Sequence, residues 1–331
     1  MRMITPMLAI ILAVASTPAA ARNIVLTNDD GLTSNVVALY KALKMAGHDV
    51  IVSVPCSNQS GMGAALYFSK PVQSMTTACR NGAAATGAVG AGAMTRAGLP
   101  ADDFYYVAGT PVMAALYGID VVGKKRWGAV PDLVLSGPNE GQNVGAITLS
   151  SGTVSNAQYA ALRGIPAIAL SAGSNSASSA ALDNPVSRIV AERIVELVAA
   201  LDRKAEGRRM LPTGMALNVN FPDNPEGARW QVSRIGSYNA YVVRFSDNMA
   251  KDASPAMRQM AHRHGATIAQ QPGIILDMNK AMPLPAQADD EAVVYKTAIA
   301  VSPLQAGYDA GETAGAFAQT MLQDLLPDSG E

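Results

Sequence analysis

Two adjacent carboxylates are the clearest sign of chemistry in this chain of 331 residues. Asp29 and Asp30 directly follow the apolar run 23–27 and precede Gly31. In open α/β sheets, ligands bind beyond the carboxyl ends of the strands. Neighbouring carboxylates repel each other unless a cation lies beside them, and oxygen ligands suit Mg²⁺, Mn²⁺ or Ca²⁺. The alternative is an ordinary turn, because Asn, Asp and Gly are also common turn residues.

Three more polar segments contain residue types that bind phosphate. They are rich in Ser, Asn and Gly, and they span 55–61, 136–145 and 151–154. In a parallel sheet, loops that follow the strands meet at one edge. Glycine and hydroxyl residues at a helix N-terminus favour an anion, because free N–H groups and the helix dipole face it. For Ser150 and Ser151, the structural alternative is capping of the helix that follows.

The elements that must position these residues follow an α/β pattern. A strand over 23–27, a helix over 36–46 and a strand over 48–54 form a βαβ unit, which builds parallel sheets. Further strands are expected over 103–107, 132–136 and 165–171, and helices over 110–117, 151–163 and 185–201. We therefore predict a doubly wound α/β fold with a mostly parallel, Rossmann-like sheet. Beyond residue 208 the pattern predicts a C-terminal β-rich arm, and the Ala- and Gly-rich stretch 81–98 predicts a flexible insertion.

Composition excludes several classes of protein. Apolar residues make up 49% of the chain and charged residues 15%, which excludes a disordered protein. Lys and Arg total 25 against 26 Asp and Glu, so no basic excess exists to bind a nucleic acid duplex or an anionic membrane. Two cysteines and three histidines exclude a Cys₄ zinc module and argue against a His-rich metal centre.

Residues 1–21 have the pattern of a secretory signal peptide. Arg2 precedes an apolar run over 4–16, and three alanines at 19–21 form a cleavage site. We expect a periplasmic or secreted protein without a membrane attachment after cleavage; an uncleaved anchor is the alternative. In an oxidising compartment Cys56 and Cys79 could form a disulfide, but two buried free thiols are an equal alternative.

Eight short stretches, in order along the chain, resemble the SurE family of 5'/3'-nucleotidases, which are also described as acid-phosphatase relatives. The matching stretches are NIVLTNDDG (23–31), PCSNQSG (55–61), GTP (109–111), PDLVLSGPNEGQNVG (131–145), SSGTV (150–154), GIPAIALS (164–171), LNVNFP (217–222) and AIAVSPL (298–304). Jointly they are highly specific, although none is specific alone.

The resemblance implies one divalent metal ion per subunit, Mg²⁺ or Mn²⁺, with Ca²⁺ as a further candidate. Its implied ligands are Asp29, Asp30, Ser60 and Asn139, all of which are retained. The implied reaction is hydrolysis of nucleoside monophosphates or other small phosphomonoesters. One of the two aspartates could act as base or nucleophile, although a metal-activated water is favoured. The implied contacts to phosphate and substrate are Asn58, Asn143, Ser151, Gly152 and Thr153.

The chain also departs from the family pattern. After GTP the family usually continues with Ala-Asp-Cys, whereas this chain has Val112, Met113 and Ala114; Ser150 replaces a common aromatic residue. These changes bear on substrate preference more than on the metal site. The competing hypothesis is a nucleotide- or phosphate-binding module without turnover. A dinucleotide-binding enzyme is the weakest alternative, because no G-x-G-x-x-G follows the first strand.

We expect residues 22–331 to form one SurE-like phosphatase domain. Its parts are an α/β core over 22–205, a β-rich arm with a returning strand over 206–310, and a C-terminal segment over 311–331. The resemblance implies that the arm is exchanged in a homodimer or a dimer of dimers. His262 and His264 are interpreted as surface residues, with a catalytic acid from the arm as the alternative.

Overall fold

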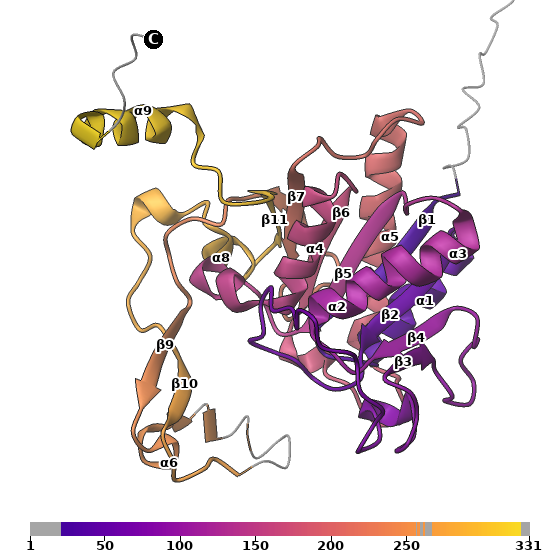
Figure 1. The fold of residues 1–331 in the computed structure, drawn as a ribbon. Helices are drawn as coiled ribbons and strands as arrows, with labels where there is room; N and C mark the ends of the chain where they lie inside the picture. Colours follow the sequence, from indigo (N-terminus) through magenta and orange to yellow (C-terminus); the bar gives the residue numbers. More distant parts are fainter. Residues whose placement is uncertain (1–20, 256, 259–260, 262–266, 326–331) are drawn as a thin grey trace, which may run out of the picture.

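A nine-stranded sheet forms the centre of the computed structural model, which describes residues 21–255, 257–258, 261 and 267–325 (Figure 1). The strand order is β3-β4-β2-β1-β5-β6-β7-β11-β8. The strands are β1 (Asn23–Thr27), β2 (Asp49–Pro55), β3 (Ala91–Ala93), β4 (Phe104–Val107), β5 (Leu133–Glu140), β6 (Ala167–Ala172), β7 (Met215–Asn220), β8 (Trp230–Val232) and β11 (Ile299–Gln305). From β4 to β7 all neighbours are parallel, whereas β3 and β11 are antiparallel to β4 and β7.

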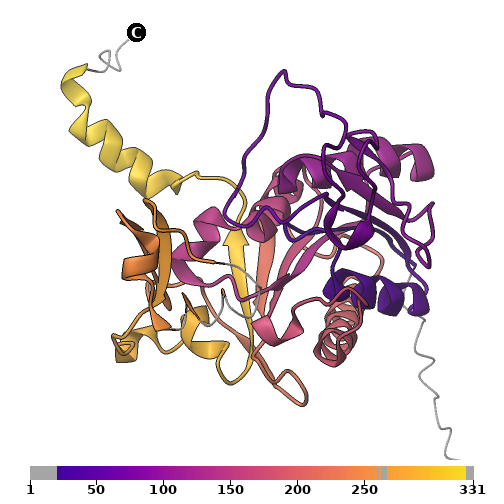
Figure 2. The same cartoon turned by 90° about the horizontal axis from the view of Figure 1, so that it is seen from below.

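Helices cover both faces of the sheet. α1 (Ser34–Met45) and α5 (Pro185–Ala205) pack together on one face (Figure 2). α4 (Gly152–Leu162) and α2 (Pro111–Leu116) pack against each other on the opposite face, where α2 continues through a π-helical stretch, Tyr117–Gly123, into α3 (Lys124–Trp127). This arrangement confirms the predicted doubly wound, mostly parallel α/β fold.

The helix α1 shows why the sequence folds in this way locally. The Thr33 hydroxyl accepts a hydrogen bond from the Val36 N–H and so caps the helix N-terminus. Val36, Leu39 and Leu43 recur at helical spacing and are all fully buried against the sheet. A long apolar strip of this kind fixes which face of the helix meets the strands.

The segment 81–98, predicted to be a flexible insertion, is instead packed into the fold. Ala83, Ala84 and Met94 are buried in the main core, and β3 adds an antiparallel edge strand to the sheet. The interpretation was wrong because alanine and glycine allow close packing as well as flexibility. Small side chains leave space for this segment to lie flat against β4.

The α/β core also extends further along the chain than the expected boundary at residue 205. β7 pairs in parallel with β6, while β11 and β8 complete the same sheet. β7 is buried on both faces, so it belongs to the core and not to an arm. The expected β-rich arm and returning strand over 206–310 thus divide into β7, β8 and β11, which belong to the central sheet, and a smaller arm.

The arm itself is a two-stranded antiparallel hairpin of β9 (Tyr241–Ser246) and β10 (Gly273–Met278), which lies away from the central sheet (Figure 1). α6 (Met249–Asp252) packs against β10, and α8 (Glu291–Val294) packs against β11. α9 (Gly311–Met321) follows β11 and extends away from the sheet. None of the helices within the described residues is both long and apolar enough to span a membrane.

A buried polar network joins α8 to the sheet. The Glu291 carboxylate accepts hydrogen bonds from the Gly145 N–H (3.1 Å) and from Asn218 Nδ2 (2.9 Å). The Asn218 and Asn220 amides also donate to the Asn143 carbonyl. Burial raises the pKa of Glu291 to about 7, although hydrogen bonds from Ser302, Gly145 and Asn218 oppose the shift. The loop after β5 is thus held by side chains from β7 and α8.

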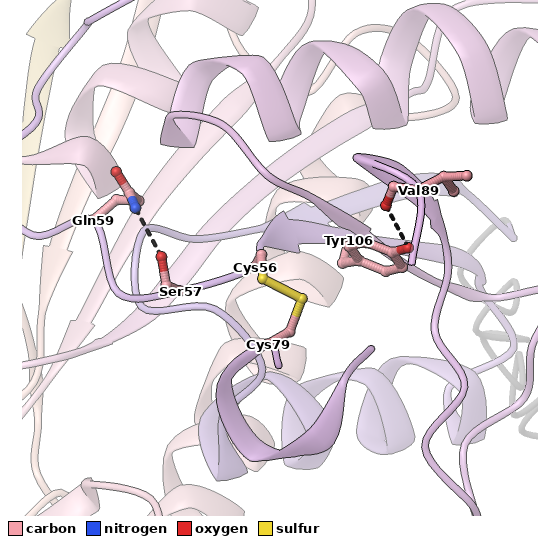
Figure 3. The surroundings of a disulfide bond; sticks show 6 residues. All are labelled: Cys56, Ser57, Gln59, Cys79, Val89 and Tyr106. Atoms are coloured by element: carbon pink, nitrogen blue, oxygen red, sulfur yellow. Dashed lines mark hydrogen bonds between the residues drawn. A yellow bond between two sulfur atoms is a disulfide. The ribbon is translucent and has the colours of Figure 1, made fainter. Parts of the chain in front are cut away.

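Cys56 and Cys79 form a disulfide in the structure, with Cα atoms 4.7 Å apart (Figure 3). The sequence left this pairing open. Cys56 directly follows β2, and its carbonyl accepts a hydrogen bond from the Arg80 N–H (2.8 Å). The disulfide therefore closes the segment between the two cysteines into a loop that is anchored at the carboxyl end of β2.

We predict that the double variant Cys56→Ser, Cys79→Ser has a free energy of unfolding about 3 kcal/mol lower than the wild type, because the open loop gains entropy in the unfolded chain. Urea denaturation followed by circular dichroism measures this loss. A reductant should lower the wild type to the same value and leave the variant unchanged. Equal unfolding free energies for variant and oxidised wild type would contradict the prediction.

We also predict that Glu291 makes the stability fall as pH rises from about 4.5 to about 7. The folded state holds the Glu291 proton above the pH at which the unfolded chain releases it, so deprotonation costs folding free energy over this range. The neutral variant Glu291→Gln lacks this loss. Its advantage over the wild type should grow from near zero at pH 4.5 to on the order of 2–3 kcal/mol above pH 7. A pH-independent difference between the two proteins would refute this assignment.

Candidate active site

The sequence-predicted aspartates lie at the switch point of the sheet. β1 pairs with β2 on one side and with β5 on the other, so the two halves of the sheet diverge from β1. Asp29 and Asp30 follow the carboxyl end of β1, and Asn139 lies near the end of β5. Crevices form at such points in open α/β sheets, and ligands bind there.

Asp29 faces the N-terminus of α4. The Thr153 hydroxyl donates a hydrogen bond of 2.6 Å to Asp29 Oδ1. A Cβ atom on Gly152 would lie 2.6 Å from the Asp29 Cβ, a distance that real Cβ atoms do not show. Glycine is therefore required at this position, because it lets the first turn of the helix approach the carboxylate.

Asp30 is held by two neighbouring loops. Asn58 Nδ2 donates to its Oδ1 at 3.1 Å, and the Glu140 N–H donates to its Oδ2 at 3.0 Å. The Arg80 guanidinium donates to the Asp30 carbonyl at 2.7 Å and to the Glu140 carboxylate at 2.7 Å. These contacts bring together the loops that follow β1, β2 and β5.

The electrostatics of the pair favour a cation. Burial raises the pKa of Asp29, against the hydrogen bonds that it accepts from Thr153 and Gly152. The pKa of Asp30 is raised well above its ordinary value by burial first, and then by the negative charges of Asp29 and Glu140. Only 3% of each residue is exposed. Arg80 lowers the pKa of Asp30, but it is also paired with Glu140, so the two carboxylates need further positive charge to stay ionised together.

The loop after β2 passes over the site and is fastened at three points. The Gln59 N–H donates to the Asp29 carbonyl at 2.8 Å, and the Gly63 N–H donates to the Ser150 carbonyl at 3.0 Å. Thr110, which caps α2, donates from its hydroxyl to the Ala65 carbonyl at 2.6 Å. This course brings the loop past both aspartates and the residues that precede α4.

The four metal ligands implied by the resemblance differ in how they are placed. Asp29 and Asp30 are buried, whereas Ser60 lies on the exposed side of the loop after β2, where its N–H donates to Asn58 Oδ1. Asn139 donates through Nδ2 to the Gly141 carbonyl, and its Oδ1 is buried without a hydrogen-bond partner among the described residues.

This orphaned Asn139 oxygen is an observation that fits a hard cation. Two carboxylates with a neutral amide and a hydroxyl form an all-oxygen donor set, which suits Mg²⁺, Mn²⁺ or Ca²⁺. Within the described part of the chain no group of three His, Cys, Asp or Glu side chains is arranged to hold a metal ion. Any metal at this edge therefore depends on the neutral oxygens as well as on the aspartates.

The implied substrate contacts fall into two groups. Asn58, Gly152 and Thr153 lie directly at the aspartates, and Ser151 caps α4 by accepting the Val154 N–H. Asn143 instead belongs to the buried network, where its Nδ2 donates to Ser171 Oγ at 3.0 Å. The structure thus brings most of the predicted residues together, whereas Asn143 lies in the buried network that supports the loop after β5.

Sequence reasoning missed Arg80 and Glu140. Both touch Asp30, and their mutual salt bridge connects the end of the disulfide loop to the loop after β5. The sequence signal that could have identified Arg80 is its position directly after Cys79, which a disulfide would bring to the end of β2. His262 and His264 lie outside the described residues, as do residues 1–20 of the predicted signal peptide.

Comparisons with known proteins agree with this site. The family model "Survival protein SurE" matches residues 24–241. A "5'-nucleotidase SurE" of Thermosipho melanesiensis is 31% identical over 215 residues, which cover 64% of this chain and 70% of that protein. Another from Polaromonas naphthalenivorans is 33% identical over 76% of this chain and 83% of its own length.

Two further relatives extend the comparison. An "Acid phosphatase" of Yarrowia lipolytica is 35% identical over 60% of this chain, a match that spans only 56% of that protein's length. The crystal structure of the SurE protein from Aquifex aeolicus superposes with a TM-score of 0.60 at 25% identity, and covers 91% of this chain and 99% of that one. The matched region includes both aspartates, the loops after β2 and β5, and the start of α4. The chain therefore belongs to the SurE family.

Proposed function

We propose that this protein is a metal-dependent phosphomonoesterase that hydrolyses nucleoside monophosphates. The observation that carries the proposal is the pair of buried carboxylates at the N-terminus of α4, together with the unpartnered oxygen of Asn139, whose neighbour Glu140 donates its N–H to Asp30. Relatives named as 5'-nucleotidases and as an acid phosphatase support the reaction class.

In this proposal Asp29, Asp30, Asn139 and Ser60 hold one divalent ion, Mg²⁺ or Mn²⁺. Two carboxylates balance its charge, while the amide and the hydroxyl stay neutral. When bound, the ion would polarise the phosphoryl oxygens and lower the pKa of a water molecule. Ser60 is exposed, so it would complete the ligand set from the solvent side of the loop.

The remaining work falls to residues at the helix N-terminus and the nearby loops. The dipole of α4 favours a phosphate dianion near the helix N-terminus, and Gly152 lets that terminus lie directly against Asp29. The Asn58 amide, held in place by one hydrogen bond to Asp30, would use its second N–H to stabilise charge on the transferred phosphoryl group. Thr153, whose hydroxyl donates to Asp29, would fix that carboxylate beside the phosphoryl group. One of the two aspartates would accept the proton of the attacking water.

We further propose that the protein works outside the cytoplasm, in the periplasm or as a secreted protein. The pattern of residues 1–21 is that of a signal peptide, and a disulfide between Cys56 and Cys79 persists in an oxidising compartment.

A homodimer, or a dimer of dimers, is proposed as the assembled state. One face of the β9–β10 hairpin carries two cross-strand apolar pairs, Phe245 with Ile274 and Val243 with Leu276. These four side chains, the apolar hairpin face, are 39–67% exposed. A contiguous apolar surface on a protruding hairpin marks an interaction site, and a second copy of the chain would cover it.

We predict that the wild type releases phosphate from nucleoside monophosphates with Mg²⁺ or Mn²⁺, and that chelation abolishes this release. Asp29→Asn should lower kcat/KM by more than about 100-fold, because even partners of metal ligands contribute 10–100-fold. Asp120→Asn removes an exposed carboxylate, paired with Arg163, and serves as the matched control. Nucleotide binding without phosphate release would instead favour a binding module, and release that persists after chelation would exclude the metal.

We predict that Phe245→Arg combined with Ile274→Arg converts the assembly to monomers, because two buried cations at an apolar contact cost several kcal/mol each. Light scattering during gel filtration measures the mass against the 34.3 kDa chain. Val130→Arg places the same charge at another exposed apolar site and should leave the mass unchanged. A wild type that is already monomeric would refute the role of the apolar hairpin face.

A further inference from the structure

Beside the two aspartates lies a hollow that the proposed metal and phosphate contacts do not use. Its outer part has a volume of about 480 Å³ and its inner part about 220 Å³. Tyr67, Met75 and Ala108 line both parts, so the two form one continuous space, which we call the side hollow. Its combined size is within the range of about 300–1,000 Å³ that is usual for small-molecule sites.

The walls of the side hollow combine apolar and polar side chains and carry no carboxylate. Met75 and Met113 contribute thioethers, Tyr67 an aromatic ring and Val72 an aliphatic side chain, while Lys70 is the charged residue of the lining. Methionine sulfur and tyrosine rings both make favourable contacts with aromatic rings. Tyr67, Met75 and Met113 thus offer one aromatic ring and two thioethers for contact with a planar aromatic group.

The inner part of the side hollow borders the proposed phosphate site. Its lining includes Ser57 and Gln59, which flank Asn58 on the loop that follows the disulfide (Figure 3). Asn58 donates to Asp30, and the Gln59 N–H donates to the Asp29 carbonyl. If the phosphate of an ester lies at the aspartates, the leaving group of that ester would thus lie next to the inner part of the side hollow.

The walls are held in place without a ligand. Cys56, bonded to Cys79, lies in the wall of the inner part. Met113 covers the backbone of Gly109 so closely that a Cβ there would lie 3.0 Å from its Cε. Thr110 ties the same stretch to the loop after β2. The part of the wall formed by Cys56, Gly109 and Met113 is therefore in place before substrate arrives, which lowers the cost of binding.

We propose that the side hollow binds the leaving group of the ester, and that Tyr67 and Met113 select an aromatic ring, either a nucleobase or an aryl group. This inference rests on the proposed phosphomonoesterase function. In the reaction, water forms the new P–O bond, the P–O bond to the leaving group breaks, and the leaving-group oxygen ends with a proton. The products are phosphate and an alcohol or phenol, and the ring of the latter stays in the side hollow until release.

The test compares three phosphate esters: adenosine monophosphate, 4-nitrophenyl phosphate and glycerol 2-phosphate, which lacks a ring. Tyr67→Ala and Met113→Ala should each lower kcat/KM about tenfold for the two ring-bearing esters, mainly through KM, and less than twofold for glycerol 2-phosphate. Phe68→Ala is the matched control, since Phe68 adjoins Tyr67, is 81% exposed and is not among the residues that line the side hollow. An effect on the adenosine ester alone assigns the hollow to nucleobases, and an effect on both ring-bearing esters assigns it to aromatic rings in general.

Calorimetric binding of adenosine, which carries no phosphate, separates this inference from the proposed function. Binding that Tyr67→Ala weakens supports the side hollow even if the wild type turns over no ester. Variants that change all three esters equally, or that leave all three unchanged, overturn the inference while the phosphatase activity stands. A wild type that binds no adenosine and shows no preference for ring-bearing esters overturns it as well.

Discussion

Two like charges side by side in a buried crevice are the constraint on which this structure depends. Asp29 and Asp30 are adjacent in sequence and almost fully buried, so each raises the free energy of ionising the other. Their surroundings reduce this cost without removing it: hydrogen bonds come from Thr153, Asn58 and the Glu140 N–H, and Arg80 supplies a nearby cation. Because Arg80 also forms a salt bridge with Glu140, its single charge does not balance Asp29 and Asp30 as well. The two aspartates therefore still need a positive ion. A site that remains electrostatically incomplete in this way is suited to a divalent metal rather than to a structural salt bridge.

The loops around this pair are fixed by backbone and covalent contacts more than by side-chain packing. The loop after β2 is held by hydrogen bonds to Asp29, Ser150 and Thr110. The disulfide between Cys56 and Cys79 encloses this loop. Backbone hydrogen bonds leave the side chains of such a loop free to face the solvent or a ligand. This explains why exposed polar residues such as Asn58 and Ser60 can lie in a defined place, and why the side hollow keeps its shape.

The sequence predicted the sheet and the two aspartates because both depend on local order. Apolar runs ending in polar loops mark parallel strands, and their carboxyl ends necessarily meet at one edge. What it missed depends on contacts across many residues. Arg80 reaches Asp30 from a turn that the Cys56–Cys79 disulfide and the Arg80 N–H to Cys56 carbonyl hydrogen bond hold at the end of β2. Glu291 lies 146 residues along the chain from Gly145, whose N–H donates to it. The segment 81–98 was misjudged for a related reason, since Ala and Gly composition does not distinguish a mobile loop from one packed closely against β4.

Two adjacent carboxylates, Asp290 and Glu291, connect the hairpin segment to the network that supports the site. Asp290 accepts hydrogen bonds from the N–H groups of Ser237 and Tyr238, where the chain leaves the sheet for the hairpin, and Arg234 also pairs with it. The next residue, Glu291, holds the loop after β5 and the β7 side chain Asn218. Both ends of the hairpin segment are therefore closed together at the point where the site's supporting network begins. The base of the hairpin also touches the loop after β5 directly, since Asn239 Oδ1 accepts a hydrogen bond from the Ala146 N–H. Asp29 and Asp30 are held mainly from β1, α4 and the loops after β2 and β5. The hairpin that a second subunit would cover is therefore in contact with the segment that leads to the start of α4, next to the groups that would carry the chemistry.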